Sequence, residues 1–474
     1  MKNSIPKRVL AFYEKYFSVL IITGLFLLGA VTIGRFLNWG SLDFDFLDWT
    51  QEGPRYLFIQ NTILQREWPL FIDSPMIESE RFLGIPDTLL VPQNILLGFL
   101  PIGQYILVNT LANYALGFFG MIIIKKRLNW NLWTFLIITP LILLNGFILS
   151  HLAVGHSMWV NAFLLPWLVV LLPGTHENRI PILWYLKNSL FILVLFLQGG
   201  FHFAIWSWGF TLVYAISKKP GFKFGLQAIT ISAFASMIRI LPAVITFSET
   251  DRRFIAGFRS FDHLVLSLTS IQLPEEPFII INSGLPVWET NFYIGLSGVI
   301  VLILFGLILP LIGKVPVKKL ANYWLPIFLM TFFSLGQMFR FTNLLPLPLV
   351  HAQRVSSRFF YLPLIFLLII AGDNLNLWLE KIKSSPSKWI LLSGVIILNL
   401  HDLIQHARLW RVDRISAFFT KIPVPLIGDV AKINDPVYIT AVIAGLILTI
   451  ITVTGLVYLS IRNKDFKPDL VERS

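Results

Sequence analysis

Three carboxylates stand close together near the start of the chain, at Asp43, Asp45 and Asp48. Phe44 and Trp49 are among the aromatic residues interleaved with them, and the segment directly follows the first long apolar run. Low-dielectric surroundings raise the pKa of a carboxyl group toward the range useful for a general base. The cluster therefore predicts a catalytic carboxylate, and Asp43 and Asp45 are the residues we expect to ligate any divalent metal ion. The alternative is a solvated loop that ends a helix.

Histidines form a second group of candidates. His151 and His156 lie five residues apart with Gly155 between them, and His202 follows a pair of glycines. An imidazole can hydrogen-bond to a phosphate group or to a sugar hydroxyl. We therefore predict that these histidines contact substrate. The alternatives are hydrogen bonds to backbone carbonyls for His151 and His156, and an ordinary tight turn at His202.

Arginines near the ends of apolar runs form a third group. Arg354 and Arg358 are spaced i, i+4, so on a helix they would share one face, and Arg340 ends the preceding run. Guanidinium groups placed in this way can hold a phosphate and stabilise it as a leaving group. The alternative is that the arginines extend to lipid headgroups at the membrane surface.

Two further sites carry charge in unusual places. Arg239 lies within an apolar run, where a charge needs a partner, and we expect that partner to be an outer-loop acid such as Glu249 or Asp48. Trp288 and Glu289 either shape an acceptor site or belong to a solvated lid.

The composition defines the elements that must position these residues. Of 474 residues, 55% are hydrophobic and 14% are charged, and the mean hydropathy is +0.72. Soluble domains contain about 45–50% apolar and about 25% charged residues, so a soluble enzyme, a disordered chain and a fibrous protein are excluded. The absence of cysteine excludes disulfides, thiolate catalysis and iron–sulfur clusters.

A membrane-spanning helix needs about 20 apolar residues. About twelve runs satisfy or approach this length, which predicts a single all-α integral membrane domain with about twelve transmembrane helices. The runs are 17–37, 102–124, 131–150, 157–172, 182–199, 201–217, 226–247, 291–312, 321–341, 359–379, 389–407 and 436–460.

The basic residues predict the orientation of these spans. Segments on one side of the membrane carry 21 of the 38 Lys and Arg residues, including Lys125, Lys126 and Arg127. The positive-inside rule therefore places both termini in the cytoplasm of a cell whose inner or plasma membrane holds the protein. The net charge of +12 is then a topology signal, and we expect no nucleic-acid partner. The outer face carries loops at 38–101, 248–290 and 408–435.

The first outer loop contains a second helical signal. Gln51 to Gln65 reads as an amphipathic helix lying in the membrane interface, with Tyr56, Ile59, Ile63 and Leu64 on one face. The inner loops contain no glycine-rich phosphate loop, so we expect the protein to work at its outer face without hydrolysing ATP.

The order of these features resembles the GT-C class of membrane glycosyltransferases, and within it the YfhO-like group of bacterial membrane proteins. The resemblance rests on Asp48 after the first span, the interfacial helix, Trp68-Pro69-Leu70, and Gly84-Ile85-Pro86. Arg354-Val-Ser-Ser-Arg358-Phe359 resembles the group's Arg-x-x-x-Arg-Phe before a late span. The chain departs from the group at Glu67-Trp68-Pro69, which replaces a glycine-led turn.

The resemblance implies a polyprenyl-phosphate sugar as donor and a glycan, lipid or protein as acceptor. Transfer would occur with inversion at the outer face. Asp48 or Asp43 would be the general base, with Asp45 as an alternative, while Arg354 and Arg358 would hold the phosphate. The competing hypotheses are a membrane transporter or lipid flippase, and a non-catalytic scaffold of the cell envelope.

Overall fold

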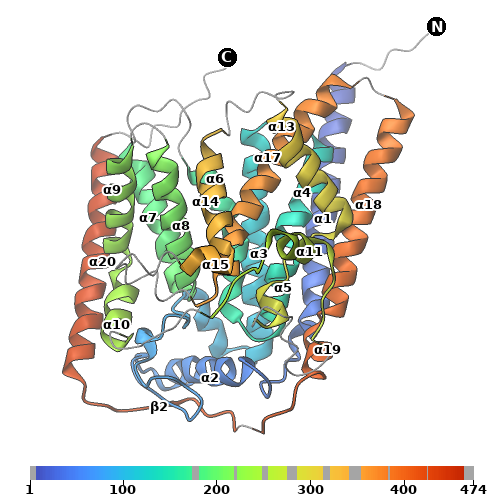
Figure 1. Ribbon diagram of the computed structural model, residues 1–474. Coiled ribbons are helices and arrows are strands. Elements are labelled where there is room, and N and C mark those ends of the chain that lie inside the picture. Colours follow the sequence, from blue (N-terminus) through green and yellow to red (C-terminus); the bar gives the residue numbers. More distant parts are fainter. Residues whose placement is uncertain are drawn as a thin grey trace.

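The computed structural model describes residues 7–172, 181–217, 221–247, 255–274, 285–312, 321–340, 354–382, 385–423 and 425–463. Helices dominate this part of the chain (Figure 1). Its only named strands are two-residue segments, β1 (Ile72–Asp73) and β2 (Asp429–Val430), which pair antiparallel with Ile72 opposite Val430. The prediction of an all-α protein is confirmed.

Among the described residues, six helical segments are long and apolar enough to cross a membrane. They belong to α1 (Lys7–Phe36), α3 (Ile102–Arg127), α4 with α5 (Leu132–Leu143 and Gly146–Ala153), η10 with α17 (Ser356–Phe360 and Tyr361–Lys381), α18 (Pro386–Leu409) and α20 (Pro436–Arg462). A seventh span results if α9 (Phe222–Ala235) and α10 (Met237–Phe247), which are bent by 84°, count as one. The chain therefore has the helices of a multi-pass membrane protein.

Five shorter apolar segments complete the set found in the described part of the chain. They are η4 with α6 (Ser157–Leu164 and Pro166–Leu171), α7 (Ile182–Leu197), α8 (Phe201–Ile216), α12 with the π-helical η6 and α13 (Gly295–Val301, Leu302–Ile308 and Leu309–Leu311), and α14 (Trp324–Ser334). Within the described residues, each of the twelve apolar runs thus falls mainly on one helix or on consecutive helical segments. Because these five segments have only 10–17 residues, the number of spans stays a prediction.

The remaining elements are short or lie in the loops. They are η1 (Asn38–Gly40), α2 (Trp49–Gln65), η2 (Phe82–Gly84), η3 (Pro92–Gly98), α11 (Phe261–Thr269), η5 (Val287–Glu289), η8 (Ala321–Tyr323), α15 (Gly336–Phe339) and α19 (Val412–Ser416). The expected amphipathic helix is α2. Tyr56 and Ile59 of the predicted apolar face are buried, whereas Leu64 is exposed.

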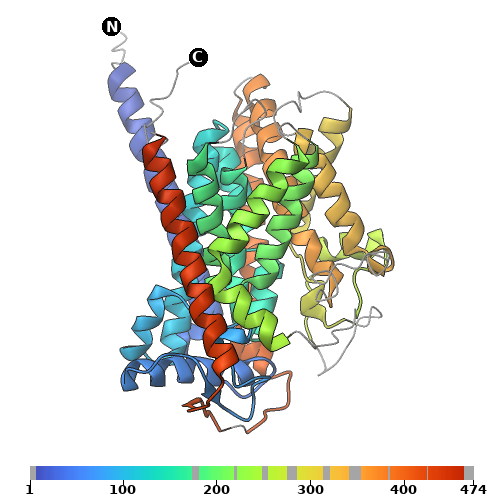
Figure 2. The same cartoon turned by 90° about the vertical axis from the view of Figure 1, so that its left-hand side faces the viewer.

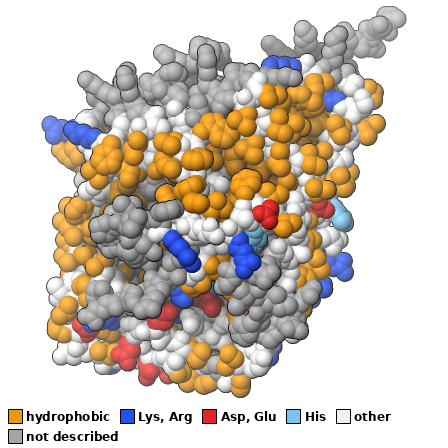
Figure 3. Space-filling view, viewed as in Figure 1, with side chains coloured by type: hydrophobic (Ala, Val, Ile, Leu, Met, Phe, Trp, Pro, Cys, Tyr) orange, Lys and Arg blue, Asp and Glu red, His pale blue; other side chains and the backbone are white. Residues whose placement is uncertain are grey.

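The long helices stand side by side, and α2 and β2 lie at one end of them (Figure 1). The start of α1 and the end of α20 lie at the opposite end from α2 and β2 (Figures 1 and 2). Figure 1 shows α2 lying across the ends of the upright helices. On the face drawn in Figure 3, hydrophobic side chains cover the upper part and acidic side chains gather toward the lower end. This distribution is expected of a membrane protein whose apolar surface contacts lipid and whose polar end contacts water.

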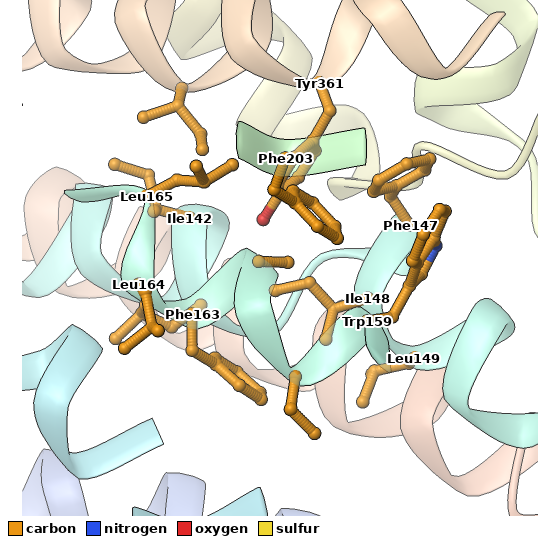
Figure 4. Close-up of a cluster of buried hydrophobic side chains, with 14 of the residues drawn as sticks. Ile142, Phe147, Ile148, Leu149, Trp159, Phe163, Leu164, Leu165, Phe203 and Tyr361 are labelled. Atoms are coloured by element: carbon orange, nitrogen blue, oxygen red, sulfur yellow. The ribbon is translucent and has the colours of Figure 1, made fainter. Parts of the chain in front are cut away.

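The centre of the bundle is formed by α4, α5 and α17, which are largely buried. Phe147 of α5 stacks on Phe292 and on Tyr361, with both pairs of ring centroids 4.5 Å apart. Trp159 and Phe203 join this cluster from η4 and α8 (Figure 4). In contrast, α1, α18 and α20 expose much of their apolar surface, which lipid chains can cover at no hydrophobic cost.

Candidate functional site

The site begins where the chain enters α2. The backbone N–H of Asp48 donates to the carbonyl of Val154 over 3.2 Å, and the indole of Trp49 donates to the carbonyl of Ala153 over 3.1 Å. Gly155 follows with a φ of +100°. A Cβ atom there would lie 2.3 Å from the backbone nitrogen of Trp49, so the approach requires glycine. The end of α5 is therefore docked directly on the start of α2.

This docking brings Asp48 to His156. The Nε2 atom of His156 lies 2.7 Å from Oδ2 of Asp48. The other ring nitrogen, Nδ1, lies 2.6 Å from Nδ1 of His151. His151 Nε2 in turn faces the Glu289 carboxylate, 3.7 Å from Oε2. A chain of polar contacts thus runs from the first outer loop through α5 to η5.

Glu289 ends this chain as half of an ion pair with Arg358. The Arg358 Nε atom donates to Oε2 over 2.7 Å and its Nη2 to Oε1 over 2.5 Å, a two-point geometry typical of strong guanidinium–carboxylate pairs. The guanidinium also lies over the Trp159 ring, 4.9 Å from its centroid. Ser357 holds the Glu289 backbone by donating to its carbonyl over 2.7 Å. Glu289 is therefore buried and paired, not part of a solvated lid.

A second buried ion pair lies on α2 itself. Arg55 donates to Glu52 over 2.5 Å, and the hydroxyl of Ser157 donates to the other oxygen of the same carboxylate. Both charged side chains are buried, although the amphipathic pattern places Arg55 away from the apolar face. A buried carboxylate needs hydrogen-bond partners, and Arg55 and Ser157 together offset the free-energy cost of burying the Glu52 carboxylate.

The ionisation of these groups follows from burial and pairing. Burial would raise the pKa of Asp48, but the charge and hydrogen bond of His156, with Arg55 and Arg358, lower it below its usual value. Burial would lower the pKa of His156, but Asp48 and Glu289 raise it. Burial raises the pKa of Glu52, and Arg55 only partly offsets this. Asp48 therefore differs from the expectation of a raised pKa in aromatic surroundings, because a histidine faces it.

These groups surround a cavity of about 510 Å³. Of the residues expected to do chemistry, Asp48, His156, His202, Arg354 and Arg358 line it. Further charged or hydroxyl-bearing lining residues are Glu52, Arg55, Glu78, Asp87, Ser157 and Glu289. Apart from Glu289, this second set could not be selected from the sequence, because isolated polar residues in loops resemble solvated ones.

The other candidate residues lie elsewhere. Asp43 and Asp45 are exposed in part and both accept from Lys421, over 3.0 and 2.8 Å, and neither lines the cavity. His151 is fully buried behind His156. Arg340 is exposed and is not part of the cavity wall. The structure therefore separates Asp48 from its two neighbours in the sequence.

The geometry of the arginine pair also differs from the expectation. Arg354 precedes the 3-10 helix η10, in which Arg358 lies, so the two do not share a face of one α-helix. Both arginines nevertheless line the same cavity.

Arg239 finds a different partner from the one expected. Its guanidinium donates to the backbone carbonyls of Leu83, Ile85, Pro86 and Thr88 over 2.9–3.3 Å. Glu249 lies outside the described residues, and Asp48 is not a partner among those described. Arg239 instead fixes the loop that carries Asp87 to the cavity, from the bend between α9 and α10.

Three of these residues could hold a metal ion. His151, His156 and Glu289 each offer one ligand atom, and these atoms lie within 4.8 Å of one another. Asp43 and Asp45, the carboxylates expected at a metal, are not part of this group.

No family model, no curated protein and no solved structure matches this chain. The function is therefore inferred from the geometry of the cavity and from the chemistry of the residues around it.

Proposed function

We propose that this protein is a membrane glycosyltransferase that moves a sugar from a polyprenyl-phosphate donor to a glycan, lipid or protein acceptor. The main observation in support of the proposal is that Asp48, Arg354 and Arg358 line one cavity. A carboxylate that accepts a proton and cations that stabilise a departing phosphate are the two requirements of this reaction.

Asp48 has the role of general base. The acceptor oxygen attacks the anomeric carbon, its proton passes to the Asp48 carboxylate, and the bond between that carbon and the phosphate oxygen breaks. Inversion at the carbon follows from this single displacement. His156 positions Asp48 through the 2.7 Å contact, and the lowered pKa keeps the carboxylate ionised at neutral pH.

The arginines have the role of binding the leaving polyprenyl phosphate. Arg354 is exposed at the cavity wall, where its charge can reach a phosphate. Arg358 gives two hydrogen bonds to Glu289, but a guanidinium has five N–H donors and keeps others for a ligand. A volume of about 510 Å³ falls in the range of small-molecule sites and suits a sugar with its phosphate.

The proposed orientation places the cavity on the outer face of the inner or plasma membrane. The basic triplet Lys125-Lys126-Arg127 ends α3, whose other end adjoins the first outer loop. By the positive-inside rule this basic end is cytoplasmic, so the loop and the cavity lie outside. A lipid-linked donor would then reach the cavity from the outer leaflet.

A transporter or flippase is favoured by one feature, the 84° bend between α9 and α10. Transporters use broken helices to form binding sites within the membrane. Here, however, Arg239 at the bend donates to carbonyls of the first outer loop. The bend therefore positions a side chain that supports this loop. The transferase remains the better-supported proposal.

The test is transfer of radiolabelled sugar from a panel of polyprenyl-phosphate monosaccharides in proteoliposomes. Asp48→Asn should reduce transfer by about 10²–10⁴-fold, the usual contribution of a general base. Asp43→Asn and Asp45→Asn are matched controls, because they remove equal charge outside the cavity, and they should retain transfer. Equal activity of all three variants would contradict the assigned base. Movement of unmodified donor across the bilayer, without transfer, would favour the flippase.

A further inference from the structure

His151, His156 and Glu289 come from three separate segments, the end of α5, the loop after it and η5. We propose that they bind one divalent transition-metal ion, of which Zn²⁺ fits the donor set best. Two imidazoles and one carboxylate are a ligand set that zinc uses in sites with an open fourth position. His156 and Glu289 also line the cavity, so the open position would face it.

The first observation concerns the Nε2 atom of His151. It is buried and has no hydrogen-bond partner among the described residues. The nearest carboxylate oxygen, Oε2 of Glu289, is 3.7 Å away, which is too far for a hydrogen bond. Two ligands bound tetrahedrally to one zinc ion at 2.0–2.2 Å lie roughly 3.3–3.5 Å apart. The gap therefore suits an ion between the two atoms better than direct contact.

The second observation concerns the groups that surround the three residues. Asp48 contacts Nε2 of His156, whereas Nδ1 of the same ring lies beside His151. Arg358 donates to both oxygens of the Glu289 carboxylate. Ligating histidines commonly give their second nitrogen to a carboxylate, and ligating carboxylates are themselves hydrogen-bonded. Asp48 and Arg358 thus provide the hydrogen-bonding partners that metal ligands commonly have.

The close contact between the histidines is compatible with this proposal. Their Nδ1 atoms lie 2.6 Å apart, so one ring donates a hydrogen bond and the other accepts it. An ion bound through Nδ1 of His156 uses the lone pair that would otherwise accept this proton. Binding of the ion through Nε2 of His151 and Nδ1 of His156 therefore replaces this hydrogen bond, and the rings separate slightly to accommodate the ion.

The test is direct metal binding by the full chain in detergent, without any sugar donor. Protein stripped with a chelator is titrated with Co²⁺, whose visible absorption reports nitrogen and oxygen ligands in a four-coordinate site. Wild type should bind one equivalent, which Zn²⁺ then displaces. His151→Gln and His156→Gln should abolish this signal, and Asp48→Asn should weaken binding by roughly 10–100-fold. His401→Gln is the matched control, because His401 is exposed on α18, and it should bind as wild type does.

Thermal unfolding and size-exclusion profiles confirm that each variant is folded before it is compared. Absence of stoichiometric Co²⁺ binding by the folded wild-type protein would overturn the proposal. So would binding that survives in folded His151→Gln and His156→Gln. Because the assay contains no donor or acceptor, its failure would count against the metal site and leave the proposed transfer reaction to its own test.

Discussion

Asp48 and His156 lie 2.7 Å apart although one precedes α2 and the other follows α5. The contact exists because Gly155 lets the end of α5 reach the backbone of Trp49. A single small residue thus decides whether the carboxylate has its partner.

Replacing Gly155 tests this relationship. Gly155→Ala places a methyl group on the backbone of α2 at a φ of +100°, where an L-residue is strained. We expect the free energy of unfolding to fall by about 1–3 kcal/mol, and sugar transfer to fall with it. Thermal unfolding and the transfer assay measure the two effects. Gly394→Ala in α18, where a Cβ meets nothing within 4 Å, should unfold at or above the wild-type temperature; equal behaviour of both variants would refute the argument.

Replacing Arg239 tests whether its hydrogen bonds hold the first outer loop in place. Arg239→Met removes the guanidinium that donates to four carbonyls in a largely buried place; of these, the Ile85 carbonyl also accepts from the N–H and hydroxyl of Thr88. We expect the free energy of unfolding to fall by at least about 2 kcal/mol. We also expect the loop at residues 83–88 to become sensitive to protease. Arg408→Met, at an exposed position of α18, is the control and should change neither property. A resistant loop in Arg239→Met would show that other contacts hold it.

Replacing Lys421 tests whether Asp43 and Asp45 are separate from the candidate site. All three side chains are at least one-third exposed, so their ion pairs are screened by water. We expect Lys421→Met to change the free energy of unfolding by less than about 1 kcal/mol. Transfer and Co²⁺ binding should stay at wild-type levels. A large loss of either would mean that this cluster contributes to the site after all.

Asp435 supplies a prediction about pH. Its carboxylate accepts from the backbone N–H of Tyr438 at the start of α20 and from Arg81, and these hydrogen bonds lower its pKa. A lowered pKa in the folded state adds stability above the unfolded value of about 3.9, and this is lost as the pH falls through the folded value. Asp435→Ala should therefore unfold at a lower temperature than wild type at pH 7.

The difference between Asp435→Ala and wild type should shrink as the pH is lowered below 4, in a series of thermal unfolding measurements. Asp435→Asn keeps a helix-capping side chain but not the charge, so it should lie between the two proteins at pH 7. A difference that stays constant down to the lowest pH would exclude the carboxylate charge as its source.

The helices of this protein could be predicted from the sequence because apolar run length is a local property. Within the described residues, all twelve runs fall mainly on helices, and the amphipathic segment after Trp49 forms α2. The shorter helices could not be assigned as spans in the same way, since 10–17 residues do not cross a bilayer unaided.

The candidate site was predictable only in part. Asp48, Arg354 and Arg358 could be selected as charged residues beside apolar runs, and all three border the cavity. The sequence could not separate Asp48 from Asp43 and Asp45, because the three share composition and neighbourhood.

The tertiary structure distinguishes Asp48 from Asp43 and Asp45. Gly155 directs His156 to Asp48, whereas Lys421, from the far end of the chain, binds the other two acids. Glu289 likewise became a site residue only when the fold placed it between a histidine and an arginine. Run length and residue type act over neighbouring positions, so the sequence by itself determined the membrane class and the helices. Ion pairs and side-chain hydrogen bonds depend on which distant segments touch, and packing of the helices decided those contacts.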